Sequence, residues 1–416
     1  MKKLLRWYSG LNIYLQLAPF LLLYLAICVV LAPHNFVDDE ERYIRFARNI
    51  LHGFYSPPLP NIDLWNGPGY PLVVAPFLLL KLPLMIIRIL NALMMYASLV
   101  LVYKTIRLYA SQKTALVCAI LLGLYFPVYE KIPLVLTECL TWFLISLIGY
   151  LFFKIGKEKK LSSKTIWLCA IAIAFLTMTK VVFGYVIIAM LFISLILFLL
   201  PKFRSSAKKF TYVFALSFLL CVPYLVYTYS VTHKPFYWTN SGGWSLYNMS
   251  APYPNDWGDW KDNPQMLQNP NYKVFVDSVL KLPPLERDAI YKTKAIENIK
   301  HYPKKYMLNC VANLGRMFFS YPFTNMEQDV KTYFTIIPNM FVLVFMVITL
   351  GLGIFHYKKL PQEIILLLLF ILIYLAGSTL VSAFRRMFYI TMPFWTVFIA
   401  YVLTNIVSIK FKHNRD

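Results

Sequence analysis

Acidic residues are scarce in this chain. Of its 416 residues, 19 are Asp or Glu and 41 are Lys or Arg, and charged residues together make up only 14%. Hydrophobic residues reach 59% and the mean hydropathy is +0.58, which is more apolar than a soluble core of this length requires. This composition excludes an ordinary soluble protein and predicts an integral membrane protein that crosses the bilayer several times.

Cysteine is also scarce, and it is scattered. The chain has six cysteines, of which all but Cys310 fall in apolar runs. Their spacing supports neither a disulfide framework nor a Cys-x-x-Cys metal site. The sequence shows no internal repeat and no low-complexity tract, so nothing in it predicts the symmetric halves that are typical of many transporters.

Apolar runs about 20 residues long recur along the chain, and a helix of that length crosses the ~30 Å hydrocarbon core of a bilayer. They predict an all-α polytopic membrane protein. The first run is longer in its apolar core than the ~7–15 residues of a signal peptide, so we expect it to be retained as an anchor. The ten expected spans cover roughly residues 11–33, 83–104, 114–130, 133–153, 165–182, 184–200, 210–231, 334–356, 362–381 and 387–408.

The net charge of +22 is explained by topology rather than by a nucleic-acid partner. Cytoplasmic loops of membrane proteins carry an excess of Lys and Arg. Ten spans place both termini and the main basic segments on one side, which is then the cytoplasmic side. These segments are MKKLLRW, KIGKEKKLSSK, PKFRSSAKK, HYKKLPQ and IKFKHNRD.

Two segments on the other side of the membrane, residues 34–82 and 232–333, are too long to be simple connectors within a single transmembrane domain spanning residues 1–416. In the first, apolar residues between Tyr43 and Leu51 recur at helical spacing and predict an amphipathic helix in the membrane interface. The stretch YSPPLPNIDLWNGPGYP then predicts a short re-entrant or surface segment.

The second segment begins with polar and aromatic residues and ends with a helical pattern. Gly242 and Gly243 predict a tight turn near its start. Pro303 interrupts the helical pattern near its end.

Residues 38–41 read Asp-Asp-Glu-Glu and follow the first apolar run directly. Carboxylates beside a membrane cost free energy to bury and repel lipid phosphate, so an acidic cluster at a span exit indicates a metal site or a general base. Acidic residues are also favoured at the positive N-terminal end of a helix, and a solvated helix start is the alternative interpretation. Local physics leaves both open.

Several short patterns follow one another in a definite order. The first is Asp39-Glu40-x-Arg42-Tyr43. The next are WNGPGYPLVVAPF, IPLVLTECLTWFLI with Glu138, AFLTMTKVVFGYV with Lys180, TNSGGWSLYNMS with Asn240, Gly243 and Tyr247, ERDAIYKTKAIENIKHYPKKY, and FRRMFYITMPFW with Arg385 and Arg386. In this order they resemble the GT-C glycosyltransferases, and among these the protein O-mannosyltransferase and aminoarabinose transferase group of family 39.

The resemblance implies an enzyme that moves a sugar from a polyprenyl phosphate to an acceptor at the extracytoplasmic face, usually with inversion. Asp39 matches the catalytic aspartate of the family, and a hydroxyl acceptor requires such a base. Glu40 would orient Asp39 or hold a divalent metal with it, and no other cofactor is indicated. The implied location is the bacterial inner membrane.

The leaving lipid phosphate must be met by cations, and the Arg fork suits phosphate geometry. Arg42, one helical turn from Asp39 and next to Tyr43, is the first candidate, and Arg385 and Arg386 are the next. A carboxylate in an apolar run, such as Glu138, must be paired with a cation or functional.

Two departures from the family pattern leave the donor sugar open. The segment Trp-Asn-Gly-Pro-Gly-Tyr stands where aminoarabinose transferases carry Glu-x-Lys-Pro-Pro, so a phosphate-binding lysine is absent unless Lys81 or Lys131 replaces it. Lys180 replaces the usual Arg of the Leu-Thr-Arg-Pro hairpin.

The expected partners are a polyprenyl-phosphate sugar, membrane lipids and a lipid, glycan or protein acceptor, without nucleic acid. The main alternative is a transporter or flippase of a lipid-linked saccharide, followed by a scaffold without activity and a membrane polysaccharide polymerase.

Overall fold

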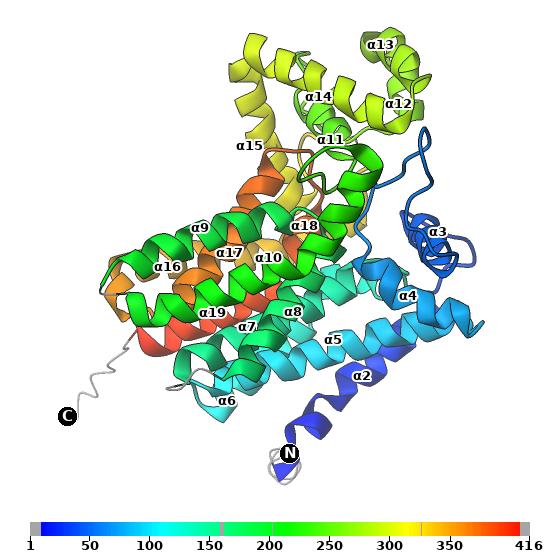
Figure 1. The fold of residues 1–416 in the computed structure, drawn as a ribbon. Coiled ribbons are helices and arrows are strands. Elements are labelled where there is room, and N and C mark those ends of the chain that lie inside the picture. The colour runs from blue at the N-terminus through cyan, green and yellow to red at the C-terminus, as the bar shows by residue number, and fades with distance from the viewer. Residues whose placement is uncertain (1–9, 159–161, 202, 326, 408–416) are drawn as a thin grey trace, which may run out of the picture.

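The computed structural model describes residues 10–158, 162–201, 203–325 and 327–407 (Figure 1). Within these ranges every regular element is a helix, which confirms the predicted all-α class. The basic N-terminal segment and the basic tail at residues 409–416 lie outside the described residues.

Six described helices are long and apolar enough to cross a membrane. They are α2 (Ile13–Val30), α5 (Leu84–Arg107), α7 (Glu138–Lys157), α10 (Arg204–Thr232), α16 (Val330–Phe355) and α17 (Gln362–Thr379). Shorter apolar helices lie beside them: α4 (Gly69–Leu79), α6 (Gln112–Gly123), α8 (Ser163–Thr179), α9 (Phe183–Leu199) and α19 (Met392–Asn405).

Every expected span overlaps one of these helices, but several of the helices are shorter than a span, so the number ten is not confirmed. The additional helix is α4, in the segment for which the sequence predicted only a short re-entrant or surface stretch. It packs against α3 (Glu40–Leu51) and α8.

The expected spans at 114–130 and 133–153 have different limits in the structure. Helix α6 ends at Gly123, and a short 3-10 helix, η1 (Phe126–Lys131), follows it. Helix α7 begins only at Glu138, because prolines at positions 127 and 133 interrupt the backbone hydrogen bonding of a continuous helix. Glu138 therefore lies in the first turn of its helix and not in the middle of an apolar span.

The expected span at 387–408 is also divided. A short helix, α18 (Arg385–Tyr389), is separated from α19, which begins at Met392 with Pro393 in its first turn. Proline is tolerated at that position because the N–H it lacks would have no partner inside the helix. The break lets Arg385 and Arg386 project from a separate turn between α17 and α19.

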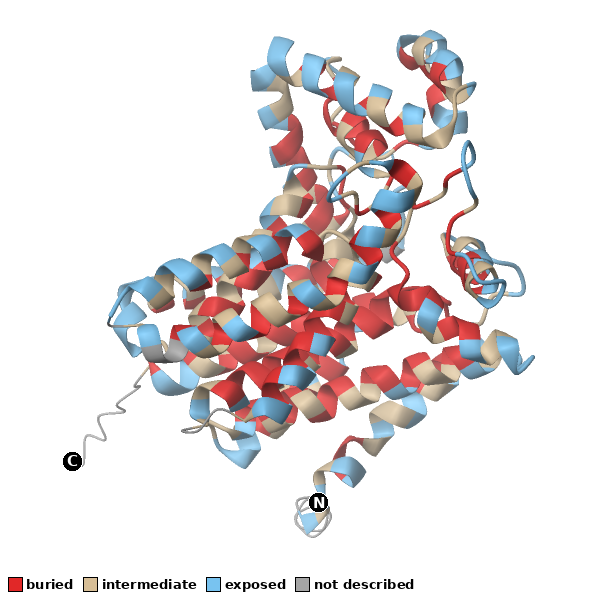
Figure 2. Ribbon diagram, in the orientation of Figure 1, coloured by how far each residue is buried: buried red, intermediate tan, exposed pale blue. Residues whose placement is uncertain are grey.

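The buried residues lie mainly where the long helices pack together, as Figure 2 shows. Helix α5 packs against α2 and α7, and α10 packs against α8 and α9. The rings of Phe183 and Tyr374 stack with their centroids 4.5 Å apart and join α9 to α17.

The second long segment, residues 232–333, forms a group of helices beyond one end of the bundle, and we call these the outer helices for that position alone (Figure 1). Helix α14 ends at His301 and α15 begins at Pro303, which confirms the predicted interruption. The start of α2 and the end of α19 lie at the opposite end of the bundle. The outer helices are α11 (Gly242–Met249), α12 (Asn263–Gln268), α13 (Pro270–Leu280), α14 (Pro284–His301) and α15 (Pro303–Phe319), and the connector η2 (Tyr357–Lys359) lies between α16 and α17.

The predicted tight turn at Gly242 and Gly243 is wrong, because both residues open helix α11. Gly243 is required for a close approach instead. A Cβ there would lie 2.0 Å from the backbone oxygen of Asp288, and the Gly243 N–H donates to Asp288 Oδ1 at 2.6 Å. A Cβ at Gly242 would meet nothing within 4 Å. Gly243 thus allows α11 to pack directly on α14.

Candidate functional site

Helix α3 carries the acidic motif. It buries Tyr43, Phe46 and Ala47 and exposes Arg45 and Arg48, which confirms the predicted amphipathic helix. Apolar residues on one face of the helix pack inward, while the basic face stays in solvent.

Asp38 and Asp39 point to different partners at the start of α3. Asp38 has a left-handed backbone conformation with φ of 52°, which Asp tolerates better than most residues. Its carboxylate lies 3.0 Å from Lys131 Nζ. Asp39 is the residue immediately before the helix.

Asp39 lies between two arginines that are far apart in the sequence. Its Oδ1 accepts a hydrogen bond from Arg42 Nη1 at 2.8 Å, and its Oδ2 lies 3.4 Å from both Nη atoms of Arg386. Arg42 also approaches Asn66 Oδ1 at 3.4 Å and covers the ring of Trp65 at 5.2 Å from its centroid. These contacts hold α18 and α3 together around one carboxylate.

Glu40 faces away from this group. Its side chain is fully buried, Oε1 accepts the N–H of Val135 at 2.7 Å, and Oε2 accepts the N–H of Val37 at 2.9 Å. Arg88 Nη2 lies 3.8 Å from Oε1. Glu40 therefore joins α3 to the non-helical segment before α7, and its two oxygens are already occupied by backbone donors.

We expect Glu40→Gln to lower thermal stability rather than to remove a chemical step. The amide has one acceptor oxygen where two N–H groups need one, so a donor would face a donor at a cost on the order of 1–3 kcal/mol. Glu41→Gln is the matched control, because Glu41 is exposed and should change nothing. A Glu40→Gln protein with unchanged melting temperature and no transfer activity would contradict this assignment and return Glu40 to the chemistry.

Five cationic side chains form what we call the basic cluster: Arg42, Lys131, Lys180, Arg385 and Arg386. Three of them have carboxylate partners other than Asp39. Lys131 pairs with Asp38, Arg385 Nη2 lies 2.8 Å from Glu130 Oε2, and Lys180 Nζ lies 3.3 Å from Glu138 Oε1.

Glu138 is thus paired with a buried lysine, one of the two roles expected for it. Its side chain is 1% exposed, and its Oε2 has no hydrogen-bond partner among the described residues. The pair stands beside Asp39 and Arg386, since these groups also interact electrostatically with Lys180.

The surroundings of Arg386 include the carboxylates of Asp39 and Glu138. Burial lowers the pKa of Arg386, but the carboxylates of Glu138 and Asp39 raise it by more than burial lowers it. The net pKa therefore lies above the ordinary value for arginine. Its Nε is buried without a hydrogen-bond partner in the described part of the chain. Burial raises the pKa of the neighbouring Tyr43, whose hydroxyl accepts a hydrogen bond from Asn66 Nδ2 at 3.0 Å.

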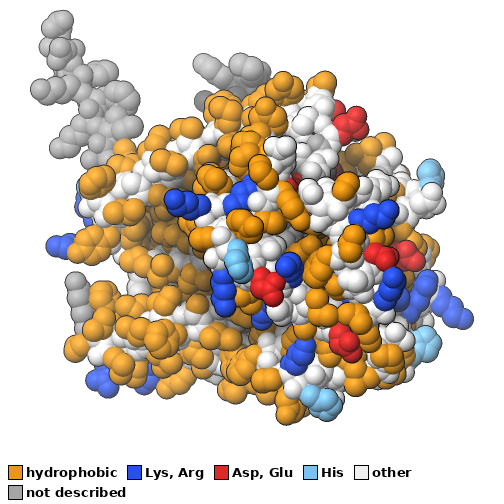
Figure 3. Space-filling model, turned by 90° about the horizontal axis from the view of Figure 1, so that it is seen from above, with side chains coloured by type: hydrophobic (Ala, Val, Ile, Leu, Met, Phe, Trp, Pro, Cys, Tyr) orange, Lys and Arg blue, Asp and Glu red, His pale blue; other side chains and the backbone are white. Residues whose placement is uncertain are grey.

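A cavity of about 1360 Å³ opens above the basic cluster and extends to the outer helices. Viewed from the side of those helices, charged groups lie mainly over the centre and right of the surface, while hydrophobic side chains dominate elsewhere (Figure 3). Eight expected site residues line the cavity: Asp39, Arg42, Tyr43, Lys131, Lys180, Asn240, Arg385 and Arg386.

The other four expected residues contribute from behind the wall. Glu40 and Glu138 are buried partners of the backbone and of Lys180, and Gly243 sets the contact between α11 and α14. Tyr247 is 5% exposed and belongs to the aromatic core of the outer helices. Asn240 has a structural task as well, because its amide bonds the backbone of Ile62 and Leu64 and ties the two outer segments together.

Sequence reasoning missed the buried charges in the part of the cavity wall that the outer helices and their loops form. Asp259 and Arg316 are 5% and 2% exposed, and Arg316 Nε lies 3.4 Å from Asp259 Oδ1. Asp288 accepts hydrogen bonds from the Gly243 N–H and the Tyr237 hydroxyl. The available signal was the scarcity of acidic residues, which makes every Asp between aromatic residues of an outer segment noteworthy.

A metal shared by Asp39 and Glu40 does not fit the donor geometry. Both oxygens of Glu40 accept backbone N–H groups, so Glu40 has no free oxygen to share a metal with Asp39. Across the described ranges no group of three or more His, Cys, Asp or Glu side chains is placed to hold a metal ion.

Comparison with known families bears on the same residues. Residues 67–227 match the sequence model of the dolichyl-phosphate-mannose-protein mannosyltransferase family. The predicted family resemblance is confirmed. The matched stretch contains Lys131, Glu138 and Lys180, while Asp39 and Arg386 lie outside it.

Solved structures of GT-C glycosyltransferases are similar to this chain at low identity. One is the oligosaccharyltransferase AglB of Archaeoglobus fulgidus in complex with an inhibitory peptide and a dolichol-phosphate, with 14% identity, a TM-score of 0.47, and coverage of 94% of this chain and 50% of that one. An oligosaccharyltransferase of the same organism tethered with an acceptor peptide has 15% identity, a TM-score of 0.49, and coverage of 95% and 50%.

ArnT from Cupriavidus metallidurans, bound to undecaprenyl phosphate, has 11% identity, a TM-score of 0.43, and coverage of 95% and 78%. In the alignments with the two archaeal oligosaccharyltransferases, this chain spans about half of their length. No curated protein matches the sequence.

Proposed function

We propose that this protein is an integral-membrane glycosyltransferase that moves a sugar from a polyprenyl-phosphate donor to an acceptor hydroxyl, with Asp39 as general base. The observation that carries the proposal is the position of Asp39 between Arg42 and Arg386 at one end of a large cavity. A base and a pair of phosphate-binding groups then face the same space, as a transfer reaction requires.

The basic cluster supports a phosphate in this space. The buried Nε of Arg386 has no partner in the described residues, and an unsatisfied buried donor costs about 1–3 kcal/mol. A phosphate oxygen would satisfy it with a charge-assisted hydrogen bond. The family whose sequence model matches residues 67–227 is named for a lipid-phosphate sugar donor, which is the same chemistry.

An apolar part of the cavity wall suits the polyprenyl chain. It adjoins Lys180 and is formed where α8 meets α9 and where α17 ends. Apolar side chains there would exclude water from the isoprenoid groups while the phosphate meets the basic cluster. The residues are Val181, Val182, Val186, Ile373 and Val381.

The proposed reaction is a single displacement. The acceptor hydroxyl oxygen attacks the anomeric carbon and passes its proton to a carboxylate oxygen of Asp39. The new carbon–oxygen bond forms as the bond from the anomeric carbon to the phosphate oxygen breaks. The lipid phosphate leaves as an anion that Arg386 and Arg42 stabilise, and attack opposite the leaving group inverts the anomeric centre.

The direct test uses the purified full chain in liposomes with radiolabelled polyprenyl-phosphate hexoses and pentoses, each offered with lipid, glycan and peptide acceptors. A glycosyltransferase converts one donor into labelled product and free polyprenyl phosphate in equal amounts. A transporter or flippase would move the labelled donor across the bilayer without cleaving it, and that result would overturn the proposal.

Topology provides a separate prediction. With both termini cytoplasmic, residues 34–82 and 232–333 face outward. In a background without other cysteines, the Asn255→Cys variant should react with an impermeant maleimide in intact cells. The Ser162→Cys variant should react only after lysis. The opposite pattern would place the cavity on the cytoplasmic side and contradict the proposed orientation.

A further inference from the structure

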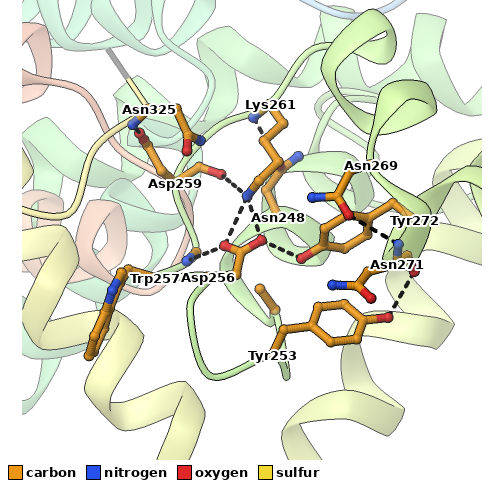
Figure 4. Close-up of polar contacts among 12 residues, drawn as sticks. Asn248, Tyr253, Asp256, Trp257, Asp259, Lys261, Asn269, Asn271, Tyr272 and Asn325 are labelled. Atoms are coloured by element: carbon orange, nitrogen blue, oxygen red, sulfur yellow. Dashed lines mark hydrogen bonds and ion pairs between the residues drawn. The ribbon is translucent and has the colours of Figure 1, made fainter. Parts of the chain in front are cut away.

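A second cavity lies among the outer helices, next to the first. It has a volume of about 250 Å³ and shares Asp259 and Thr324 with the wall of the main cavity. The proposed reaction makes no use of it. Figure 4 labels most of its polar residues, and those labelled come from the loop before α12, from the start of α13 and from Asn325.

The charged groups of this second cavity are engaged by the protein itself. Lys261 Nζ lies 2.7 Å from Asp256 Oδ2, and the same carboxylate accepts the hydroxyl of Tyr272 at 2.5 Å (Figure 4). Asp259 pairs with Arg316 and accepts the N–H of Asn325. Opposite charges are therefore neutralised in the wall, and the cavity has little attraction for a phosphate or a cation.

Side-chain amides are the polar groups left to meet a ligand. Asn255 and Asn271 are exposed and line the cavity, and no hydrogen bond of either side-chain amide occurs within the described chain. Asn269 uses only its oxygen, which accepts the N–H of Asn271 at 3.0 Å. An amide offers both a donor and an acceptor, which matches a hydroxyl group that also has both.

Aromatic rings complete the lining. Tyr253, Trp257 and Phe323 border the same cavity. The Tyr253 hydroxyl donates to the backbone oxygen of Asn271 at 2.8 Å, which holds the ring of Tyr253 next to that residue. Aromatic faces and edges pack well on the C–H groups of a compact ring. The ammonium of Lys305, which is not a lining residue, covers the Trp257 ring at 4.3 Å and donates to the backbone oxygen of Asp256. Amides beside aromatic rings, with each charged lining residue paired, therefore suit a neutral polyhydroxylated ring.

We infer that the second cavity binds one ring of a neutral saccharide. Its volume is just below the ~300–1,000 Å³ of sites for drug-sized ligands, which fits a single ring. A peptide is less suited, because peptide sites use a free strand edge or an apolar groove and the lining offers neither. Given the proposed function, the shared wall at Asp259 and Thr324 makes this ring part of a glycan acceptor whose reacting hydroxyl lies in the main cavity.

The experiment measures saccharide binding without catalysis. The full chain is placed in phospholipid nanodiscs free of sugar-based detergent, and saturation-transfer NMR is recorded with methyl α-mannoside, methyl β-glucoside and N-acetylglucosamine. A Gly-Ser-Gly peptide and inorganic phosphate serve as comparison probes. The test variant is Asn255→Ala with Asn271→Ala, and the matched control is Gln268→Ala, an exposed amide of α12 outside the lining.

At least one saccharide should bind, and the double variant should weaken its binding about tenfold or more, because two hydrogen-bonding groups are lost. Gln268→Ala should bind it normally. Binding of none of the three saccharides, equal binding by the double variant, or preferential binding of the peptide or phosphate would overturn the inference.

Asp39→Asn distinguishes a failure of this inference from a failure of the proposed function. That variant should bind the saccharide as the unmodified protein does. If the unmodified protein transferred no sugar but bound a saccharide through Asn255 and Asn271, the cavity assignment would stand and the enzyme assignment would fall. If it transferred sugar and the double variant still bound the saccharide fully, only the cavity assignment would fall.

Discussion

Asp39→Asn is expected to reduce sugar transfer by about 10²–10⁴-fold, the range typical of a removed general base. The amide keeps the shape of the side chain, but it has one acceptor oxygen for the two arginines that contact Asp39, and it cannot take the proton of the acceptor hydroxyl. The protein should remain inserted and should bind the donor. Turnover is measured with the labelled donor, and folding is checked by thermal unfolding and gel filtration.

Asp38→Asn is the matched control for this substitution. Asp38 precedes Asp39 in the acidic motif, but its carboxylate turns to Lys131 and its side chain is 48% exposed, so loss of that pair should cost little. We therefore expect nearly normal turnover. Equal losses at both positions would contradict a base role for Asp39 and would favour a general electrostatic effect of the cluster.

Arg386→Lys is expected to weaken donor binding about ten- to hundredfold, because a charge-assisted hydrogen bond contributes about 1.5–3 kcal/mol. Lysine keeps the positive charge beside Asp39 but loses the planar fork and its buried Nε donor. The donor KM should rise and turnover should fall, with the acceptor KM nearly unchanged. Steady-state titration of each substrate separates these effects.

Arg42→Lys should give a smaller effect of the same kind, since Arg42 is more exposed and is already bonded to Asp39. Arg48→Lys on the exposed face of α3 is the matched control and should be silent. If the lysine variants at Arg42 and Arg386 both kept full turnover and donor affinity, the assignment of these two arginines to the lipid phosphate would be wrong. Lys131 and Lys180 would then be the residues to examine.

Local features were predictable because they depend on neighbours in the chain. The amphipathic pattern of α3 predicted its buried face, and the spacing of Asp39 and Arg42 placed them one helical turn apart, where they form an ion pair at 2.8 Å. Pro303 predicted the break between α14 and α15. Each of these follows from backbone geometry within a few residues.

Helix limits in the apolar runs were less predictable. Hydrophobicity alone does not distinguish a helix from a buried non-helical segment that other side chains satisfy. The carbonyls of Ile132 and Leu134 accept hydrogen bonds from Asn91, and the N–H of Val135 donates to Glu40. These long-range partners permit an irregular chain before α7, where an uninterrupted span was expected.

The class of the protein, the helix that carries the acidic motif and the family resemblance that points to Asp39 could all be predicted from the amino-acid sequence. Composition and periodicity suffice there, because they report how each short segment responds to water and lipid. Long-range packing was needed to show that Arg386, 347 residues from Asp39, contacts the carboxylate of Asp39. It was also needed to show that the adjacent Glu40 accepts hydrogen bonds from the backbone instead. Asp39 and Glu40 are consecutive carboxylates, and a sequence alone does not distinguish their roles. The backbone directs their side chains to different partners, and those partners come from distant parts of the chain.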